Sequence, residues 1–462
     1  MSTATFEHRS EVPASAPETF AWHTRPGALQ RLTPPWERAE VVRHDGVHDG
    51  DIAELRVAVG PVTQRWVARH RDFIDGVQFA DEQVEGPFAH WLHTHRVEPR
   101  GADRCVIEDR IEYALPMGGL GRAFGGGFVQ RKLERMFAYR HATLAGDLER
   151  HLSVPRTPLT VAISGATGLI GTALGAFLAT GGHRVLSLVR RAARGDDEIA
   201  WDPAAGTIDG ARLEGVDAVI HLAGANVGEG RWTVARKREL RDSRIAGTSL
   251  LARTLASLAK KPAVLVSASA IGWYGAQDGL VDETAPAGDG FLAELCREWE
   301  AAADPARAAG IRVAHPRIGI VLTPSGGALA KMLPPFRMGL GATLGDGSAP
   351  LSWVSLDDVL GALHFAVYRR DLEGAFNVTA PSPTTQGELA SALGRALHRP
   401  AGLKVPGAAL RLLLGEMATS VLTGARVVPG RLQSMRFSFQ QPTLDGALAR
   451  ALGVVASSAA PL

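Results

Sequence analysis

The chain has 462 residues, of which 45% are hydrophobic and 21% are charged, and its formal net charge is +2. This balance is typical of globular proteins, and the length predicts about three domains of roughly 150 residues each. The small net charge, with no basic run that carries interleaved aromatic residues, argues against nucleic acid as a partner.

The spacing of the cysteines and the length of the apolar segments indicate in which cellular compartment the protein resides. Cys105 and Cys296 lie far apart and belong to no Cys-x-x-Cys motif, so we expect neither a disulfide framework nor a zinc cluster. The N-terminal segment lacks the apolar core of a signal peptide. No stretch reaches the ~18 to 20 apolar residues that span a bilayer. We therefore expect a cytoplasmic protein without a membrane span.

Residues 1–152 are predicted to form an α+β domain. We expect an early helix over residues 16–32, alternating strands such as AELRVAVG, TQRWVARHRDF and RCVIEDRIEYALP, and a helix over residues 127–152. This order is that of a helix-grip fold, and with RLTPPW after the first helix the region resembles the START-like (SRPBCC) ligand-binding superfamily. The resemblance implies a cavity between sheet and helix, and hence an apolar ligand.

The motif HWLHTH in this region contains His90, His93 and His95. On a strand, His93 and His95 share one face, and imidazole is a common metal ligand. Because no carboxylate or cysteine motif accompanies them, the sequence favours a polar rim or pocket wall. We therefore assign no metal ligand.

The pattern changes after residues 151–160, HLSVPRTPLT, whose prolines and threonines are typical of a linker. From residue 159, short and almost continuously apolar runs alternate with segments of helical spacing. The runs are LTVAIS, RVLSLV, DAVIHLA, AVLVSAS and RVAHPRIGIVL. They predict a Rossmann fold, a doubly wound parallel α/β sheet, over residues 159–395. Residues 396–450 are predicted to form two or three helices that cap a substrate.

Gly165, Gly168 and Gly171 form a G-x-x-G-x-x-G motif directly after the first of these runs. The first glycine allows the tight turn, the second lets the backbone approach a pyrophosphate, and the third lets helix and strand pack closely. The helix then presents N–H groups to the anion. Three further residues of the turn are expected to contact the dinucleotide: Thr167, Leu169 and Ile170.

The second apolar run ends in Arg190 and Arg191, and no acidic residue follows before Asp196. An NAD site usually has a carboxylate here that binds the ribose 2′-OH, whereas guanidinium groups favour a 2′-phosphate. The alternative is a solvated basic corner. We favour NADP(H) over NAD(H) as the cofactor.

Residues 159–450 resemble the extended short-chain dehydrogenases/reductases, and more narrowly the atypical subgroup described as sugar-nucleotide epimerases or cell-division inhibitors. The motifs that carry the resemblance are SGATGLIG, HLAGANV, SRIAGT, EWEAAA, PRIGIVL, SWVSLDDV and FNVTAP. The resemblance implies that Leu222, Ala223 and Gly224 line the adenosine.

Further family positions concern the phosphates and the reaction centre. Arg244 of SRIAGT is implied to reach the cofactor phosphates, and Glu239 either faces the same groove or lies on a solvated helix face. Ser267 of VSASAIGWYG would lie near the nicotinamide, and Ser269 would bond a substrate hydroxyl or carbonyl. The alternative is that small residues here only allow close approach of the cofactor.

The family's proton-transferring pair, Tyr-x-x-x-Lys, is absent from the sequence. The residues four positions after Tyr113, Tyr139, Tyr274 and Tyr368 are Met117, Thr143, Asp278 and Leu372. Alignment on EWEAAA implies Leu292 and Cys296 at the positions of the pair, and a shift by one residue gives Phe291 and Leu295. Another proton source is then needed. Tyr274 is our candidate, ahead of Asp282 or Glu283.

We therefore expect an NADP(H)-binding oxidoreductase or epimerase-like protein that acts on an unknown small molecule, with Ser269 and Tyr274 as catalytic residues. The alternative, motivated by the missing pair, is a non-catalytic NADP(H)-responsive ligand-binding or regulatory protein. The sequence does not indicate the oligomeric state.

Overall fold

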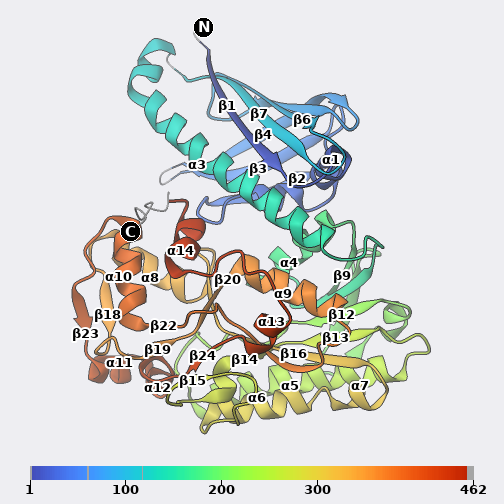
Figure 1. Cartoon of the computed structure of the whole chain (residues 1–462), viewed down its shortest axis with the longest axis vertical. Helices are drawn as coiled ribbons and strands as arrows, with labels where there is room; N and C mark the ends of the chain where they lie inside the picture. The colour runs from blue at the N-terminus through green and yellow to red at the C-terminus, as the bar shows by residue number, and fades with distance from the viewer. Residues whose placement is uncertain (1–2, 60–61, 117, 455–462) are drawn as a thin grey trace. The chain divides into compact units, whose positions relative to one another are not determined.

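The computed structural model describes residues 3–59, 62–116 and 118–454 (Figure 1). The chain forms two compact units. One spans Met1–Pro158 and Ala176–His183, and the other spans Leu159–Gly175 and Arg184–Leu462. Within the described residues, no helix combines the length and the hydropathy needed to cross a membrane.

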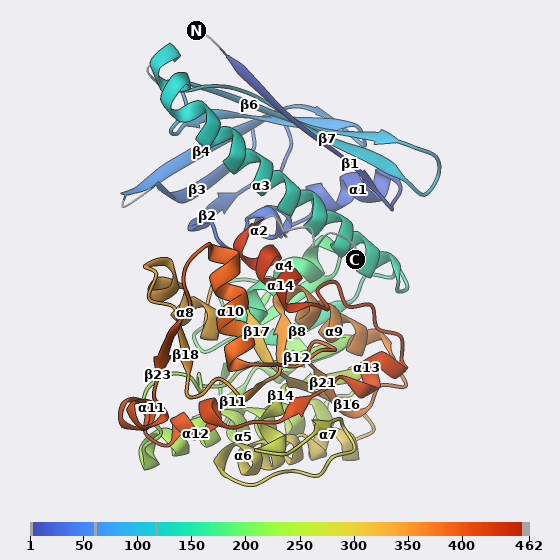
Figure 2. The same ribbon diagram turned by 60° about the vertical axis from the view of Figure 1, so that its left-hand side comes forward.

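The first unit is a seven-stranded antiparallel sheet with a long helix, α3 (Gly118–Leu152), that runs across one face of it (Figure 2). The strand order is β1-β7-β6-β5-β4-β3-β2. Two short helices, α1 (Ala16–Thr24) and α2 (Ala28–Leu32), connect β1 to β2. The strands are β1 (Ala4–Val12), β2 (Ala39–His44), β3 (Ile52–Val59), β4 (Val62–Ile74), β5 (Gln78–Glu85), β6 (His90–Pro99) and β7 (Cys105–Ala114). The predicted helix-grip fold is confirmed.

Helix α3 has one apolar face that packs on the sheet. Leu133, Phe137, Leu144 and Leu148 are each at most 3% exposed and recur at helical spacing. They join two clusters with the inward residues of the strands, including Ile107 and Ile111 of β7. The unit therefore has its own core.

Two features of the first unit differ from the sequence prediction. Strand β1 was not predicted, because four of its nine residues are charged or histidine and only Phe6 and Val12 are buried. Helix α3 begins at Gly118 rather than at residue 127. Glycine disfavours a helix by only ~1 kcal/mol per residue, so tertiary context overrides the preference.

The second unit is built on a nine-stranded sheet, in the order β11-β10-β9-β8-β12-β13-β16-β14 with β21 beside β16. Except for the antiparallel pair β10 and β11, the strands pair in parallel. The strands are β8 (Thr160–Ser164), β9 (Arg184–Val189), β10 (Glu198–Asp202), β11 (Thr207–Ile208), β12 (Ala218–His221), β13 (Val264–Ser267), β14 (Ser269–Ala270), β16 (Arg312–Ile318) and β21 (Gly374–Val378). The strand order reverses between β8 and β12, where Rossmann folds bind their ligands. The predicted doubly wound sheet is confirmed.

Helices cover both faces of this sheet, with α5, α6 and α7 on one side and α4 and α9 on the other (Figure 1). These helices are α4 (Leu169–Thr180), α5 (Val234–Ser257), α6 (Phe291–Ala301), α7 (Asp304–Ala308) and α9 (Leu356–Tyr368). A buried cluster that joins α5 and α7 to the central strands forms the core on one side.

The region after residue 396 contains more structure than predicted. It holds four helices instead of two or three: α11 (Gly407–Leu414), α12 (Met417–Leu422), α13 (Gly430–Ser434) and α14 (Leu444–Leu452). It also contains two short strands. Strand β23 (Leu403–Val405) pairs with β18 (Ala342–Leu344), and β24 (Arg426–Val427) pairs with β15 (Leu280–Val281). The remaining elements are β17 (Ile320–Leu322), β19 (Pro350–Leu351), β20 (Trp353–Ser355), β22 (Thr384–Thr385), α8 (Gly327–Arg337), α10 (Gln386–Leu397), and the 3₁₀ turns η1 (Gly210–Leu213) and η2 (Ile271–Tyr274).

Candidate dinucleotide and substrate site

The glycine motif forms a tight turn between β8 and α4. Gly165 has φ 71°, a left-handed conformation that favours glycine. The amide of Gly168 donates to the carbonyl of Gly165 at 2.9 Å. A β-carbon on Gly171 would lie 2.1 Å from that same carbonyl oxygen. In this turn the backbone of α4 at Gly171 therefore packs directly against the backbone of Gly165. The N–H groups at the start of α4 are available to bind an anion.

Ser164 and His221 join the ends of β8 and β12 at the point where the strand order reverses. The Oγ of Ser164 lies 2.5 Å from Nδ1 of His221 and accepts from the amide of Leu222 at 3.2 Å. The Nε2 of His221 lies 2.9 Å from Oγ1 of Thr248. Burial, with a smaller effect of the Arg244 charge, lowers the pKa of His221 to about 4. A neutral imidazole therefore links the ends of β8 and β12. The sequence analysis did not predict this role for His221.

The residues predicted to line the adenosine, Leu222, Ala223 and Gly224, follow β12 directly and are partly buried or exposed. The guanidinium carbon of Arg244 lies 3.2 Å from the place that a β-carbon on Gly224 would occupy. Arg244 therefore reaches the same edge from α5, and its contact with the cofactor phosphates stays a prediction.

Arg244 is 7% exposed, donates to the carbonyl of Leu240 at 3.1 Å and stacks on Trp299. No carboxylate pairs with it among the described residues. Glu239 is exposed and pairs with Arg236 at 2.6 Å. Five residues along a helix correspond to a rotation of about 140°, so Glu239 and Arg244 project in different directions.

Arg190 and Arg191 follow β9 and differ in their contacts. Arg191 makes a bidentate pair with Glu198, with N–O distances of 2.5 and 2.6 Å. Arg190 is exposed and makes no ion pair within the described part of the chain. Arg190 is therefore the arginine whose charge is not already paired at the end of this strand.

Ser267 ends β13 with its side chain fully buried. Its Oγ has no hydrogen-bond partner among the described residues. A buried hydroxyl without a partner costs ~1–3 kcal/mol, so such groups mark places where another molecule completes the bonding. Together with the glycine turn, whose closest approaches a β-carbon would block, this orphan hydroxyl fits a bound dinucleotide.

Ser269 belongs to a buried polar network. Its hydroxyl donates to Oε1 of Glu300 at 2.7 Å, and both carboxylate oxygens of Glu300 accept from Arg317 at 2.9 and 3.0 Å. Arg317 also lies over the ring of Trp273, 3.8 Å from its centroid. The structure thus brings Ser269 to a bidentate ion pair, whose members Glu300 and Arg317 were not predicted.

Tyr274 joins the same network through Arg317. Its hydroxyl donates to Oδ1 of Asn377 at 2.8 Å and accepts from Arg317 at 3.1 Å. The side chain is fully buried, and burial raises the pKa of its phenol. Ser269 and Tyr274 are therefore linked through Arg317 rather than in direct contact, and a catalytic role for Tyr274 stays a prediction.

The residues implied at the positions of the missing pair lie on α6. Leu292 packs against Gly272 of η2, where a β-carbon would lie 3.1 Å from that of Leu292. Cys296 donates to the carbonyl of Ala270 at 3.6 Å, and burial raises the pKa of its thiol to about 11. Neither side chain can replace a tyrosine or a lysine in proton transfer.

A parallel sheet with a reversed strand order and a glycine turn at the reversal defines a dinucleotide-binding Rossmann fold. Residues 161–379 match the NAD dependent epimerase/dehydratase family, and residues 405–451 match a domain of unknown function, DUF1731. The chain belongs to the NAD dependent epimerase/dehydratase family.

Relatives support this assignment over most of their own length. An epimerase family protein of Mycobacterium bovis is 45% identical over 290 residues, which are 62% of this chain and 96% of that protein. The structure of human epimerase family protein SDR39U1 with NADPH is 32% identical and covers 64% of this chain and 100% of its own, with a TM-score of 0.59. A nucleoside-diphosphate sugar epimerase from Corynebacterium glutamicum covers 97% of this chain and 90% of its own at 30% identity, with a TM-score of 0.80.

The first unit contains an apolar cavity. Residues 12–140 match the family described as polyketide cyclase / dehydrase and lipid transport. The cavity has a volume of about 350 Å³ and lies between the sheet and α2 and α3. Its apolar lining includes Trp66, Phe79, Trp91, Leu133 and Met136. The cavity that the START-like resemblance implied is therefore present.

Two histidines of the HWLHTH motif line this cavity and have carboxylates beside them. His93 and His95 line it, whereas His90 is exposed. The sequence showed no accompanying carboxylate motif, but Asp81 and Asp109 lie beside them because β5 and β7 are the neighbours of β6. The sequence has no such motif because the two acids come from other strands, where only the fold brings them beside the histidines.

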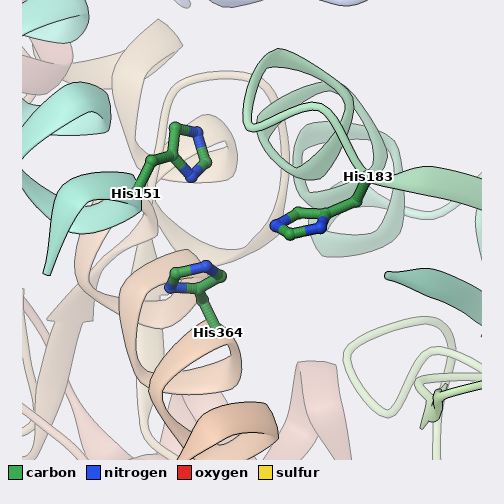
Figure 3. Close-up of side chains that lie close together, drawn as sticks. All are labelled: His151, His183 and His364. Atoms are coloured by element: carbon green, nitrogen blue, oxygen red, sulfur yellow. The ribbon is translucent and has the colours of Figure 1, made fainter. Parts of the chain in front are cut away.

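Three further histidines make contacts with neighbouring rings. Figure 3 shows His151 at the end of α3 and His183 before β9, whose ring centroids lie 6.4 Å apart. His151 also stacks on Phe177 at 4.4 Å. The third side chain of the figure, His364, belongs to α9 of the second unit and contacts Tyr368 there.

Proposed function

We propose that the second unit binds NADP(H) and uses it in oxidoreductase or epimerase chemistry on a small molecule. One observation carries the proposal: at the edge where the glycine turn lies, the buried hydroxyl of Ser267 has no hydrogen-bond partner and the buried guanidinium of Arg244 has no carboxylate partner among the described residues. A dinucleotide offers phosphates, ribose hydroxyls and an amide to such groups. The human relative with NADPH supports the same reading.

Arg190 is the proposed contact for the 2′-phosphate. We expect Arg190→Gln to weaken NADPH binding by about 10- to 100-fold, because charge-assisted hydrogen bonds contribute ~1.5–3 kcal/mol. NADH lacks the phosphate, so its affinity should change by less than about threefold. Titration of cofactor fluorescence with both nucleotides measures the difference.

The matched control is Arg191→Gln, since Arg191 follows the same strand but is held by Glu198. We expect it to change NADPH affinity much less than Arg190→Gln. If Arg190→Gln weakens the affinities for NADPH and NADH equally, the proposed contact between Arg190 and the 2′-phosphate is wrong.

NADP(H), when bound, supplies or accepts a hydride. In the absence of Tyr-x-x-x-Lys, we propose that Ser269 orients the substrate oxygen. Because its proton points to Glu300, its lone pairs are available to accept from a substrate hydroxyl. Glu300 accepts the Ser269 proton in a hydrogen bond of 2.7 Å and is itself held by Arg317.

Ser269→Ala tests this role. We expect turnover to fall about 100-fold with unchanged NADPH affinity, in the range seen when a positioned hydrogen-bonding group is removed. Folding should survive, because Oε1 of Glu300 still accepts from Arg317. The assay uses a panel of carbonyl compounds and nucleoside-diphosphate sugars, with the exposed Ser257→Ala as the control variant. Wild-type turnover that Ser269→Ala leaves intact would contradict the role.

The second candidate function is a non-catalytic NADP(H)-responsive binding or regulatory protein. The observation that favours it is that the hydroxyls of both Ser269 and Tyr274 are engaged inside the protein. This candidate predicts NADPH binding without turnover of any compound in the panel. Cofactor-dependent conversion that Ser269→Ala abolishes would exclude it.

A further inference from the structure

Four polar side chains converge on the inner face of the antiparallel sheet in the first unit. The strand register places Asp81 of β5 opposite His93 of β6, and His95 of β6 opposite Asp109 of β7. Cross-strand partners and residues two apart on one strand share a face. No side chain of the four is more than 16% exposed.

Three of the four face the cavity with suitable spacing. Asp81, His93 and His95 line it, whereas Asp109 does not. Oδ2 of Asp81 lies 3.1 Å from Nδ1 of His93 and 3.7 Å from Nε2 of His95. Two ligands at ~2.1 Å from one metal ion, at tetrahedral or octahedral angles, lie roughly 3.0 to 3.5 Å apart. The first of these distances falls within that range and the second lies just above it, and all three ligand atoms lie within 4.8 Å of one another.

Asp109 lies behind the histidines and fixes their orientation. Its Oδ1 is 2.8 Å from Nε2 of His93 and 2.6 Å from Nδ1 of His95, although the second contact is not aligned for a hydrogen bond. Its Oδ2 is 2.5 Å from His141, which in turn contacts Ser10 at 2.6 Å. A carboxylate that holds the far nitrogen of each histidine is the usual support of metal-binding imidazoles.

The surroundings are consistent with a buried cation. Asp81 and Asp109 place two carboxylates beside the imidazoles of His93 and His95, and the side chains of all four residues are at most 16% exposed. The ring of Phe79 stacks on His95 at 4.4 Å, which keeps the site in apolar surroundings. Two carboxylates in such surroundings attract positive charge strongly.

We propose that Asp81, His93 and His95 bind one divalent first-row transition-metal ion, such as Zn²⁺, Fe²⁺ or Co²⁺. Two imidazoles and one carboxylate on one face are typical of these ions and leave coordination positions open. Those positions face the cavity of about 350 Å³. An apolar ligand that carries an oxygen donor would complete the coordination there.

Titration of the chelator-treated, full-length protein with Co²⁺ tests the site. We expect one equivalent to bind per chain with a visible absorption band, and Zn²⁺ to displace it. His95→Ala and Asp81→Ala should each weaken Co²⁺ binding at least tenfold, and Asp109→Asn about 10- to 100-fold. The matched control is His44→Ala, because His44 lines the same cavity outside the cluster.

Folding of each variant is checked by circular dichroism and by NADPH binding, which the second unit is proposed to carry. Failure of wild type to take up one equivalent of Co²⁺ would overturn the metal site. Uptake that persists unchanged in folded His95→Ala would also overturn it. If the variants do not fold, the wild-type titration still decides the question.

Discussion

Replacing Gly171 by alanine is expected to weaken NADPH binding by at least about 100-fold. A β-carbon there would lie 2.1 Å from the carbonyl oxygen of Gly165, 2.8 Å from its carbonyl carbon and 2.9 Å from the Cα of Ala166. All three atoms are backbone, so relief requires the strand and the helix to separate. That movement displaces the N–H groups proposed to hold the phosphates, and 100-fold corresponds to ~2.7 kcal/mol. Fluorescence titration of NADPH measures the loss.

Gly175→Ala is the control, because Gly175 lies one turn further along α4. A β-carbon there meets only a methyl group of Val185 at 3.9 Å. The Gly175→Ala variant should therefore bind NADPH with wild-type affinity. Alanine in place of glycine should also stabilise helix α4 by ~0.5–1 kcal/mol. Wild-type NADPH affinity in folded Gly171→Ala would show that this turn does not hold the cofactor.

The parallel sheet could be predicted because its strands are buried on both faces. The run LTVAIS became β8 (Thr160–Ser164), and RVLSLV became β9 (Arg184–Val189) with unchanged bounds. Strand β1 gave no such signal, because one of its faces is solvated and its inward positions include His8 and Ser10. A strand of this kind becomes recognisable only through its pairing with β7.

The candidate site was predictable where its residues lie close in sequence. The glycine turn is a single segment, and Ser267 and Ser269 belong to one motif. The polar network around Ser269 is assembled from Glu300, Arg317 and Asn377, which come from α6, β16 and β21. Each lies in a motif that identified the family, namely EWEAAA, PRIGIVL and FNVTAP. A polar residue within each of these otherwise apolar or family-specific motifs was the signal in the sequence that could have identified the network.

The histidine and aspartate cluster shows why sequence spacing alone was not enough. His93 and His95 were identified, but Asp81 and Asp109 lie 12 and 14 residues away from the nearer histidine on other strands. Only the register of β5, β6 and β7 brings the four side chains together. In an antiparallel sheet, ligands from neighbouring strands have no fixed sequence spacing, because loop lengths vary.

Glu300→Ala is expected to lower the free energy of unfolding by ~3–5 kcal/mol, the usual cost of leaving one partner of a buried ion pair alone. The side chains of Arg317 and Glu300 are 4% and 12% exposed. Burial lowers the pKa of Arg317, and the bonds to Glu300 outweigh that effect and raise it in the native protein. After the substitution the guanidinium still stays charged, because arginine is protonated at all ordinary pH values in proteins. Denaturant unfolding, followed by tryptophan fluorescence because Trp273 packs on Arg317, measures the loss.

The bidentate pair of Arg369 and Asp371 provides a control of the same geometry at the surface. Its side chains are 37% and 61% exposed, so Asp371→Ala should cost less than about 1 kcal/mol. Adding Arg317→Met to Glu300→Ala should recover much of the stability, because the double variant no longer buries an unpaired charge. If Glu300→Ala costs no more than Asp371→Ala, Arg317 is solvated in the native protein, and the network around Ser269 is not the buried support that its proposed role requires.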